Sequence, residues 1–360
     1  MAPKLAVCIP TFDREELLRP LLDSFVHQPG AEGIQIVVSD NASADGTEDL
    51  CRDYARRWRQ IRYVRAPENR GPDHNFLSAV AHADAEFCWL FGSDDVARPG
   101  SVARVLDLLD EADPDILLFD RVWCDYWMQP ARIDHFLRTD GRAEFDTRRG
   151  GDVRRYLDAS TGLCALLSYL SSTVVRKSRW DGTPPMDEYL GSAYVHTAKL
   201  LSVFSSGAHV EYVPEPLVLC RGDNEGLMEH GLFNRARIDF VWYARLVDQF
   251  FPREPAHGAA LRVVRREFTV PRLLLLAAEA ADGEPRELLE RMRVFRYPRT
   301  TRAAVGLAAR VAPLRALLRG CAAPARAFWW RRSRHITAAE LHAADEAHSQ
   351  AALHAPPSAG

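Results

Sequence analysis

Two adjacent carboxylates, Asp94 and Asp95, are the residues of this chain whose types and spacing point most clearly to chemistry. They follow the apolar residues 86–91, which predict a buried strand, and Gly92 ends that strand. Like charges side by side repel each other, so such a pair usually needs a cation or a shared proton. A divalent metal that carries phosphate oxygens would supply the cation. A solvated acidic turn is the alternative, and these two residues alone do not decide between them.

The elements that must position this pair alternate between strand and helix patterns. Strands are predicted at Leu5–Ile9, Ile34–Val38, Ile61–Arg65, Glu86–Phe91 and Asp115–Phe119. Helices are predicted at Arg14–His27, from about Asp45–Glu48 onward with Asp45 as a possible cap, at Asp73–Ala83 and at Pro99–Glu111. Repeated βαβ units imply an α/β fold with a parallel sheet covered by helices on both faces.

Polar clusters follow three of these strands, where ligands bind in such sheets. The clusters are Thr11–Arg14, Ser39–Ser43 and Ser93–Asp95. Three independent polar turns at one edge are less probable than one site. The sequence therefore predicts a binding site at the carboxyl edge of the sheet, with the acid pair in it.

Composition excludes several other classes of protein. The chain has 360 residues, 47% of them hydrophobic, and a formal charge of -3, which is globular and carries no overall nucleic-acid signature. Its seven cysteines form no CxxC pair, which favours reduced thiols in a cytosolic protein. Neither a GxGxxG nor a GxxxxGK[ST] motif occurs, so a dinucleotide dehydrogenase and a P-loop NTPase are disfavoured. No signal peptide and no membrane span are expected.

Four segments, taken in order, resemble family 2 glycosyltransferases with the GT-A fold. They are Ile9–Arg14, Val37–Thr47, Glu68–Gly71 and Phe91–Asp95. The resemblance covers roughly the first third of the chain. It implies a Rossmann-like, mostly parallel sheet and a helical C-terminal region. The implied divisions are 1–125 for the nucleotide-sugar half, 126–232 for the acceptor half, 233–334 for helices with a basic amphipathic segment, and 335–360 for a disordered tail.

The resemblance also implies roles for individual residues. Thr11, Arg14, Asp40, Arg70, Asp94 and Arg221 are expected to bind the nucleotide sugar, with Asp40 near the base or ribose. Asp95 is the expected ligand of Mn²⁺ or Mg²⁺, because breaking the donor bond leaves a diphosphate whose growing charge must be neutralised. Ser93 stands where the family motif has its first acid. Arg221, in the segment 221–224, is expected to clamp the leaving group.

An inverting transfer also needs a general base opposite the leaving group. The resemblance places it after the first half, where Glu188, Asp187 and His196 are the candidates, with Glu188 preferred. His196 lies eight residues after Glu188, so the two could share one face of a helix. A structural histidine against the apolar residues 199–201 is the alternative.

The segment Arg291–Arg334 contains twelve arginines and no acidic residue or lysine. An apolar stripe of Leu307, Val311, Leu314 and Leu318 follows helical spacing, and Pro313 is expected to kink or split that helix. The aromatic and basic residues 328–332 come next. This pattern favours either peripheral docking on an anionic inner membrane leaflet or packing against an acidic catalytic body.

The sequence thus predicts a metal-dependent inverting glycosyltransferase. It would move a hexosyl or deoxyhexosyl group from a nucleoside diphosphate to a hydroxyl of a saccharide or lipid-linked saccharide. A cytoplasmic location is expected, with possible attachment to the inner face of the cell membrane. The alternatives are a sugar nucleotidylyltransferase and a non-catalytic protein that binds nucleotide sugars or a membrane surface.

Overall fold

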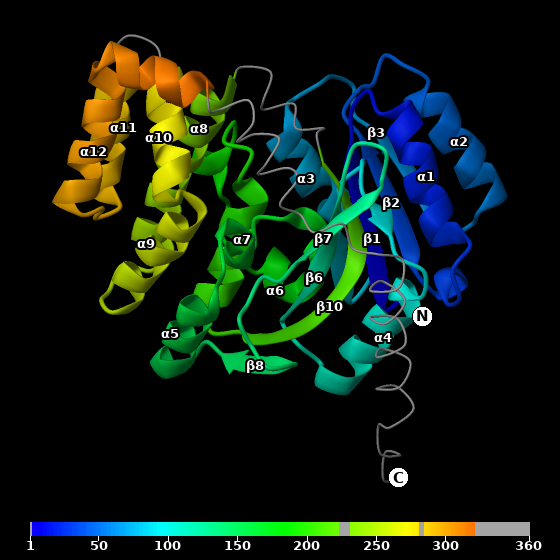
Figure 1. Ribbon diagram of the computed structural model, residues 1–360. Coiled ribbons are helices and arrows are strands. Elements are labelled where there is room, and N and C mark those ends of the chain that lie inside the picture. The colour runs from blue at the N-terminus through cyan, green and yellow to red at the C-terminus, as the bar shows by residue number, and fades with distance from the viewer. Residues whose placement is uncertain (1, 223–230, 281–283, 321–360) are drawn as a thin grey trace.

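The computed structural model describes residues 2–222, 231–280 and 284–320. Ten strands form one sheet in the order β3-β2-β1-β4-β9-β6-β10-β5, with β7 paired to β6 and β8 paired to β10. Figure 1 shows this curved sheet between helices α1, α2 and α4 on one side and the remaining helices on the other. The fold is therefore α/β with a helical C-terminal region, as predicted.

The first half consists of the predicted βαβ units. Its strands are β1 (Leu5–Thr11), β2 (Gln35–Asp40), β3 (Ile61–Arg65) and β4 (Phe87–Leu90), and its helices are α1 (Glu15–Val26), α2 (Thr47–Arg57) and α3 (Pro72–Ala81). β1 pairs in parallel with β2 and β4, and all of its residues are buried. The predicted cap is wrong, because Gly46 is the N-cap of α2 and no side chain caps it, although the backbone N–H of Thr47 donates to Asp45 Oδ1 over 3.0 Å.

The sheet also contains antiparallel pairs, and the sequence did not predict the strand that forms two of them inside the sheet. Strand β9 (Thr173–Arg176) from the second half lies between β4 and β6 (Ile116–Cys124), and it runs antiparallel to both. Its central residues Val174 and Val175 are buried. A short apolar strand covered on both faces carries no pattern that reveals its direction or its neighbours, which is why the sequence missed it.

Residues 126–154, for which no helix or strand is predicted from the sequence, contain regular structure. Strand β7 (Pro130–Asp134) forms an edge hairpin with β6, β8 (Ala143–Asp146) pairs with β10, and helix α5 (Gly150–Ala159) follows. All five residues of β7 are only partly buried. Partial burial on both faces weakens the alternation of apolar and polar residues by which a strand is recognised.

The rest of the sheet and the helices beside it comprise short elements and one long strand. These are β5 (Val96–Ala97), α4 (Ser101–Ala112), α6 (Lys177–Asp181), a single turn at Asp187–Tyr189, α7 (Val195–Ser205) and β10 (His209–Arg221). β10 pairs in parallel with β6 along most of its length. It therefore ends at the same edge of the sheet as β1, β2 and β4, which we call the carboxyl edge.

The helical region packs on the second half of the sheet. It contains α8 (Gly231–Phe250), α9 (Ala256–Glu267), α10 (Val270–Glu279), α11 (Glu284–Val294) and α12 (Arg299–Arg310), and residues 312–320 are also helical. The helices are interrupted at residues 251–255, and the break expected from Pro313 occurs at residue 311. Phe240 and Phe268 stack with ring centroids 4.2 Å apart, in one core with Ala198 of α7 and Leu118 of β6.

Candidate active site

The carboxyl edge brings together most of the residues that the sequence singled out there. Thr11 ends β1 and lies opposite Asp40 at the end of β2, while Arg221 ends β10. Asp94 and Asp95 follow β4 by a few residues. In Figure 1 these strand ends lie at the upper edge of the sheet, opposite β8. The predicted convergence of the three polar clusters is therefore present.

Asp95 is enclosed by residues of the second half. It is 3% exposed, and its Oδ2 accepts hydrogen bonds from the hydroxyls of Tyr169 (2.7 Å) and Ser171. Its Oδ1 accepts one from the backbone N–H of Arg221 over 3.0 Å. Burial, followed by the charge of Asp94, raises the pKa of Asp95 to about 7, although these donors oppose the shift. These hydrogen bonds fix the orientation of the Asp95 carboxylate, but their donors are neutral groups that do not balance its charge.

Asp94 lies beside Asp95 and is more open, with 26% of its side chain exposed. Its Oδ2 is 3.3 Å from a guanidinium nitrogen of Arg14. Both carboxylates fold over Gly92, where an added Cβ would lie 3.1 Å from Asp95 Oδ2 and 3.2 Å from Asp94 Oδ1. The close approach of two acids thus depends on the absence of a side chain at residue 92.

Arg221 connects the end of β10 to the acid pair. Its Nε donates to the backbone carbonyl of Asp94 over 2.9 Å, and another guanidinium nitrogen donates to the carbonyl of Tyr126. The guanidinium also lies 5.8 Å from the centre of the Tyr126 ring. In this arrangement Arg221 holds the turn that carries the acids. Asp223 and Asn224 of the same predicted segment lie outside the described residues.

Thr11 and Asp40 differ in how fully their side-chain oxygens are used in hydrogen bonds within the protein. Asp40 is fully buried, and its oxygens accept hydrogen bonds from the N–H and hydroxyl of Ser43 and from the hydroxyl of Tyr63. It organises the turn after β2. Thr11 is 2% exposed, and among the described residues its hydroxyl oxygen has no hydrogen-bond partner. Buried polar groups without partners are rare, so this hydroxyl is the better candidate for a ligand contact.

The loop after β3 is fastened to the loop after β2 by Asn41. Its Nδ2 donates to Asn69 Oδ1 (2.7 Å) and to the carbonyl of Gly71 (3.2 Å), and its Oδ1 accepts from the N–H of Arg70 (3.0 Å). Gly71 has φ +85°, a conformation that favours glycine. The side chain of Arg70 is exposed at the mouth of this edge.

The three candidate bases do not share a helix face. Asp187 and Glu188 lie in an exposed single turn, and helix α7 begins only at Val195. Glu188 Oε1 lies 3.5 Å from Gln249 Nε2, in the last turn of α8. His196 is 3% exposed, and burial lowers its pKa to about 4. The predicted common face is therefore wrong, because the turn separates the acids from the helix.

Sequence reasoning missed two side chains that build the site and a buried polar group on β6. Tyr169 and Ser171 hold Asp95 from a segment with no recognisable motif, 74 and 76 residues away. Also unforeseen is the buried Asp120, whose Oδ2 lies 2.6 Å from His135 Nδ1 and whose Oδ1 accepts from the Tyr212 hydroxyl. An acid inside the apolar strand 116–124 is a sequence signal for the buried Asp120. Nothing in the sequence marks Tyr169 and Ser171.

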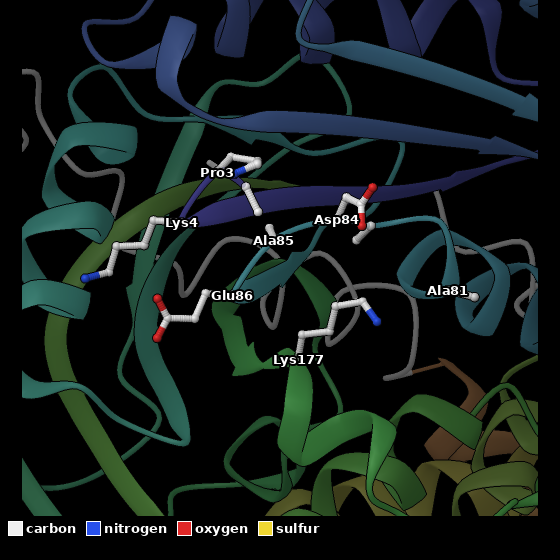
Figure 2. Close-up of a pocket in the computed structure, with 9 residues that line it drawn as sticks. Pro3, Lys4, Ala81, Asp84, Ala85, Glu86 and Lys177 are labelled. Carbon is white, nitrogen blue, oxygen red and sulfur yellow. The ribbon is translucent and has the colours of Figure 1, made fainter.

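A surface groove lies at the opposite edge of the sheet, and its charged residues do not form a site like the one at the carboxyl edge. Its volume is about 670 Å³, and Figure 2 shows Lys4, Asp84, Glu86 and Lys177 among its lining residues. Lys4 pairs with Asp110, and Lys177 pairs with Asp181. These charges are neutralised in surface pairs and do not converge on one point, so we assign no chemistry to the groove.

Two comparisons decide the family. Residues 6–150 match the family described as Glycosyl transferase family 2. The chain is 38% identical to the abequosyltransferase RfbV of Salmonella typhimurium over 256 residues, which are 69% of this chain and 76% of that protein. The chain belongs to glycosyl transferase family 2. It is therefore a glycosyltransferase, and the nucleotidylyltransferase and non-catalytic alternatives do not hold.

Further relatives resemble this glycosyltransferase over shorter stretches or in fold alone. A GalNAc(5)-diNAcBac-PP-undecaprenol β-1,3-glucosyltransferase of Campylobacter jejuni is 28% identical over 110 residues, 30% of this chain and 35% of that protein. The structure of S. aureus TarS 1–349 has a TM-score of 0.60 at 16% identity and covers 97% of this chain and 92% of its own. The mannosyltransferase PcManGT of Pyrobaculum calidifontis, solved with GDP-Man and Mn²⁺, has a TM-score of 0.52 at 19% identity, over 96% and 86%. These likenesses confirm the GT-A fold.

The predicted basic and apolar stripe is only partly a packing surface. Leu314 and Leu318 pack against the core, whereas Leu307 is 59% exposed and Val311 is also exposed. None of the helices in residues 2–222, 231–280 and 284–320 has the length and apolar character needed to cross a membrane. The aromatic and basic residues 328–332 lie outside the described part of the chain.

Proposed function

We propose that this glycosyltransferase is metal-dependent and inverting, and that it binds its nucleoside diphosphate donor at the carboxyl edge. The observation that carries the proposal is the acid pair Asp94–Asp95, held over Gly92 beside Arg14. The buried hydroxyl of Thr11, which has no hydrogen-bond partner in the described part of the chain, lies at the same edge and supports a donor contact there. Arg70, exposed at the mouth, is placed to meet phosphate oxygens.

The donor set fits one divalent ion, Mn²⁺ or Mg²⁺. A carboxylate offers about four lone-pair sites. Asp95 uses two on Oδ2 and one on Oδ1, which leaves one position on Oδ1 for an ion. A cation beside Asp95 would also offset the burial and repulsion that raise the pKa of this acid. Bound there, the ion would neutralise the diphosphate charge that grows as the sugar leaves.

The sugar and the acceptor are inferred from relatives and from one exposed side chain. The abequosyltransferase relative supports a deoxyhexosyl donor, and the undecaprenol-linked acceptor in the name of the Campylobacter relative supports a lipid-linked saccharide. Trp127 is 77% exposed, and its ring meets that of Tyr126, whose carbonyl binds Arg221. An exposed aromatic ring next to the donor site suits the apolar face of a saccharide acceptor.

For the general base we propose an exposed carboxylate, Glu188 or Asp187, rather than His196. An acceptor hydroxyl must come within hydrogen-bond reach of the base, and His196 is enclosed between the Ser168 carbonyl and the Phe76 ring. Glu188→Gln or Asp187→Asn is expected to lower turnover by a factor of about 10²–10⁴, with donor hydrolysis less affected. Normal transfer by both variants would remove these acids from the mechanism.

One assay tests the proposed function as a whole. The purified chain is incubated with a panel of nucleotide sugars and Mn²⁺, with and without chelator, and the released nucleotide is identified. The proposal expects slow release of a nucleoside diphosphate from one donor, which chelation abolishes and a saccharide acceptor accelerates. The anomeric configuration of the product, read by NMR, is expected to be inverted. Chelator-insensitive turnover or a retained configuration would contradict the proposal.

Peripheral attachment to an anionic membrane is a separate proposal. It is supported by exposed Leu307 and Leu317, at 59% and 63%, on arginine-rich helices that carry no acid. The double variant Leu307→Glu/Leu317→Glu is expected to lose co-sedimentation with anionic vesicles. Val270→Glu, an exposed apolar position on α10, serves as the control. Equal pelleting of all three proteins would exclude this surface as the anchor.

A further inference from the structure

A second group of metal-ligating side chains lies far from the donor site. Glu144 on β8 and His209 and Glu211 on β10 each direct one ligand atom into a region where all three atoms lie within 4.8 Å of one another. His209 Nε2 is 4.0 Å from Glu144 Oε2 and 4.0 Å from Glu211 Oε2. β10 has 13 residues from His209 to Arg221, so about 40 Å of strand separates this group from Arg221.

The sheet register forces these side chains together. Glu211 pairs directly with Glu144 across the antiparallel ladder of β8 and β10. His209 precedes Glu211 by two residues, so both point to the same face of β10. Two acids opposite each other on one face destabilise a strand pair unless something positive lies between them. The lower edge of Figure 1 shows β8 against the beginning of β10.

Glu211 supplies independent evidence that this group binds a ligand. The residue is fully buried, and among the described residues its Oε2, the oxygen that faces His209, has no hydrogen-bond partner. Its other oxygen, Oε1, is engaged by Arg142, which also pairs with Glu111. Burying a carboxylate oxygen without a partner is costly. The arginine therefore satisfies one side of this acid and leaves the other side open.

The spacing suits a bound cation better than a direct contact. At 4.0 Å the histidine and the acids are too far apart for hydrogen bonds. Ligands of a tetrahedral zinc ion with bonds of about 2.0–2.2 Å lie about 3.4 Å from one another. Glu144 and His209 are partly exposed and can close this gap by small side-chain movements. One imidazole nitrogen and two carboxylate oxygens are ligands that zinc accepts.

We propose that Glu144, His209 and Glu211 bind a zinc ion that fastens β8 to β10, separately from the donor site. Three protein ligands leave one position for water. The ion would balance the two acids across the ladder and occupy the open side of Glu211. Its role is structural, because the group lies at the opposite end of β10 from the acid pair Asp94–Asp95.

Zinc titration of the full chain by calorimetry tests this proposal. The wild type is expected to show one binding event that is lost, or weakened at least about tenfold, in both His209→Ala and Glu144→Gln. His27→Ala, at an exposed histidine on the first-half side, is the matched control and is expected to keep it. The chain has 12 histidines, and others among them can bind zinc. The test therefore compares zinc binding between the wild type and the variants instead of measuring the total zinc bound.

Two further measurements separate this site from the donor site. Zinc is expected to raise the unfolding temperature of the wild type and of Asp95→Asn, but not that of His209→Ala. Cobalt substitution is expected to give the visible absorption of a four-coordinate ion in the wild type only. Manganese-supported turnover is expected to be unchanged in His209→Ala. Equal zinc binding by wild type, His209→Ala and Glu144→Gln, or no binding event in the wild type, would overturn the proposal.

Discussion

The two halves of the catalytic body are built differently. In the first half, the loops after β2 and β3 are fastened to each other by side-chain hydrogen bonds, such as those of Asn41 with Asn69 and Gly71. In the second half, β9 is inserted between β4 and β6, and it follows the segment that carries Tyr169 and Ser171. The first half presents the acids, and the second half holds Asp95 in place.

This division means that neither half contains a complete site. The motifs that mark the family lie in the first half, yet both oxygens of Asp95 are bound by groups from the second. Changes at the same type of residue should therefore have different consequences in the two halves.

Among the variants that change support of the acid pair rather than the acids themselves, Gly92→Ala is expected to have the largest effect. The added Cβ would lie within 3.2 Å of both carboxylates and push them apart, so turnover is expected to fall by about 10²-fold with the fold retained. Gly33→Ala is the control, because nothing lies within 4 Å of the Cβ that it adds. Initial rates of nucleoside diphosphate release compare the two variants. Similar rates for both would show that the spacing over Gly92 is not critical.

His196→Asn is expected to change stability with pH rather than catalysis. The folded protein holds the pKa of His196 at about 4, below its usual 6.5, so the unfolded chain takes up a proton first as pH falls. The wild type should therefore lose about 2 kcal/mol of unfolding free energy relative to the variant between pH 7 and 4.5. Urea denaturation at both pH values measures this. A variant that is equally pH-sensitive but inactive would indicate a catalytic histidine instead.

Tyr169→Phe tests the support that the second half gives to Asp95. Removing this hydroxyl leaves one hydrogen bond fewer on Oδ2, and turnover is expected to fall by about tenfold. Tyr54→Phe removes a similar hydroxyl bond to Asp23, which lies on α1 away from the site, and should leave turnover unchanged. If both tyrosine variants retain full activity, Asp95 does not depend on the second half for its orientation.

The same change at two buried threonines should have opposite consequences. Thr11→Val removes a hydroxyl without a described partner, so stability should hold while the KM for the donor rises about threefold. Thr147→Val in the second half removes bonds to Phe204 and Ala208 and should cost about 1–3 kcal/mol of unfolding free energy. Donor kinetics and denaturant unfolding give both values. An unchanged donor KM in Thr11→Val would argue against a donor contact at this hydroxyl.

The first half could be predicted from the sequence because its order is local. Each strand of the βαβ units is followed by its own helix and polar turn, so Thr11, Asp40 and Asp94 could be assigned to one edge from their positions alone. Strand β3 was predicted with the bounds Ile61–Arg65 that the structure shows. The different roles of Thr11 and Asp40 at the carboxyl edge could not be predicted, because the enclosure of Asp40 depends on Tyr63 from the next strand.

The second half could not be predicted because its order depends on pairings between distant residues. The position of β9 is fixed by pairs such as Trp89 with Val174 and Leu117 with Val174. Neither neighbour can be recognised from the few residues of the strand itself. The prediction that Glu188 and His196 share one helix face was wrong for a related reason. Helical spacing applies only inside a continuous helix, and α7 begins at Val195.

The central claim is that the acid pair at the carboxyl edge is the donor-sugar site. The most direct test compares manganese-supported nucleoside diphosphate release by the wild type, Asp95→Asn and Asp84→Asn, the last at an exposed acid in the groove of Figure 2. We expect a loss of about 10²–10³-fold in Asp95→Asn and wild-type release in Asp84→Asn. Wild-type release by a folded Asp95→Asn protein would contradict the claim.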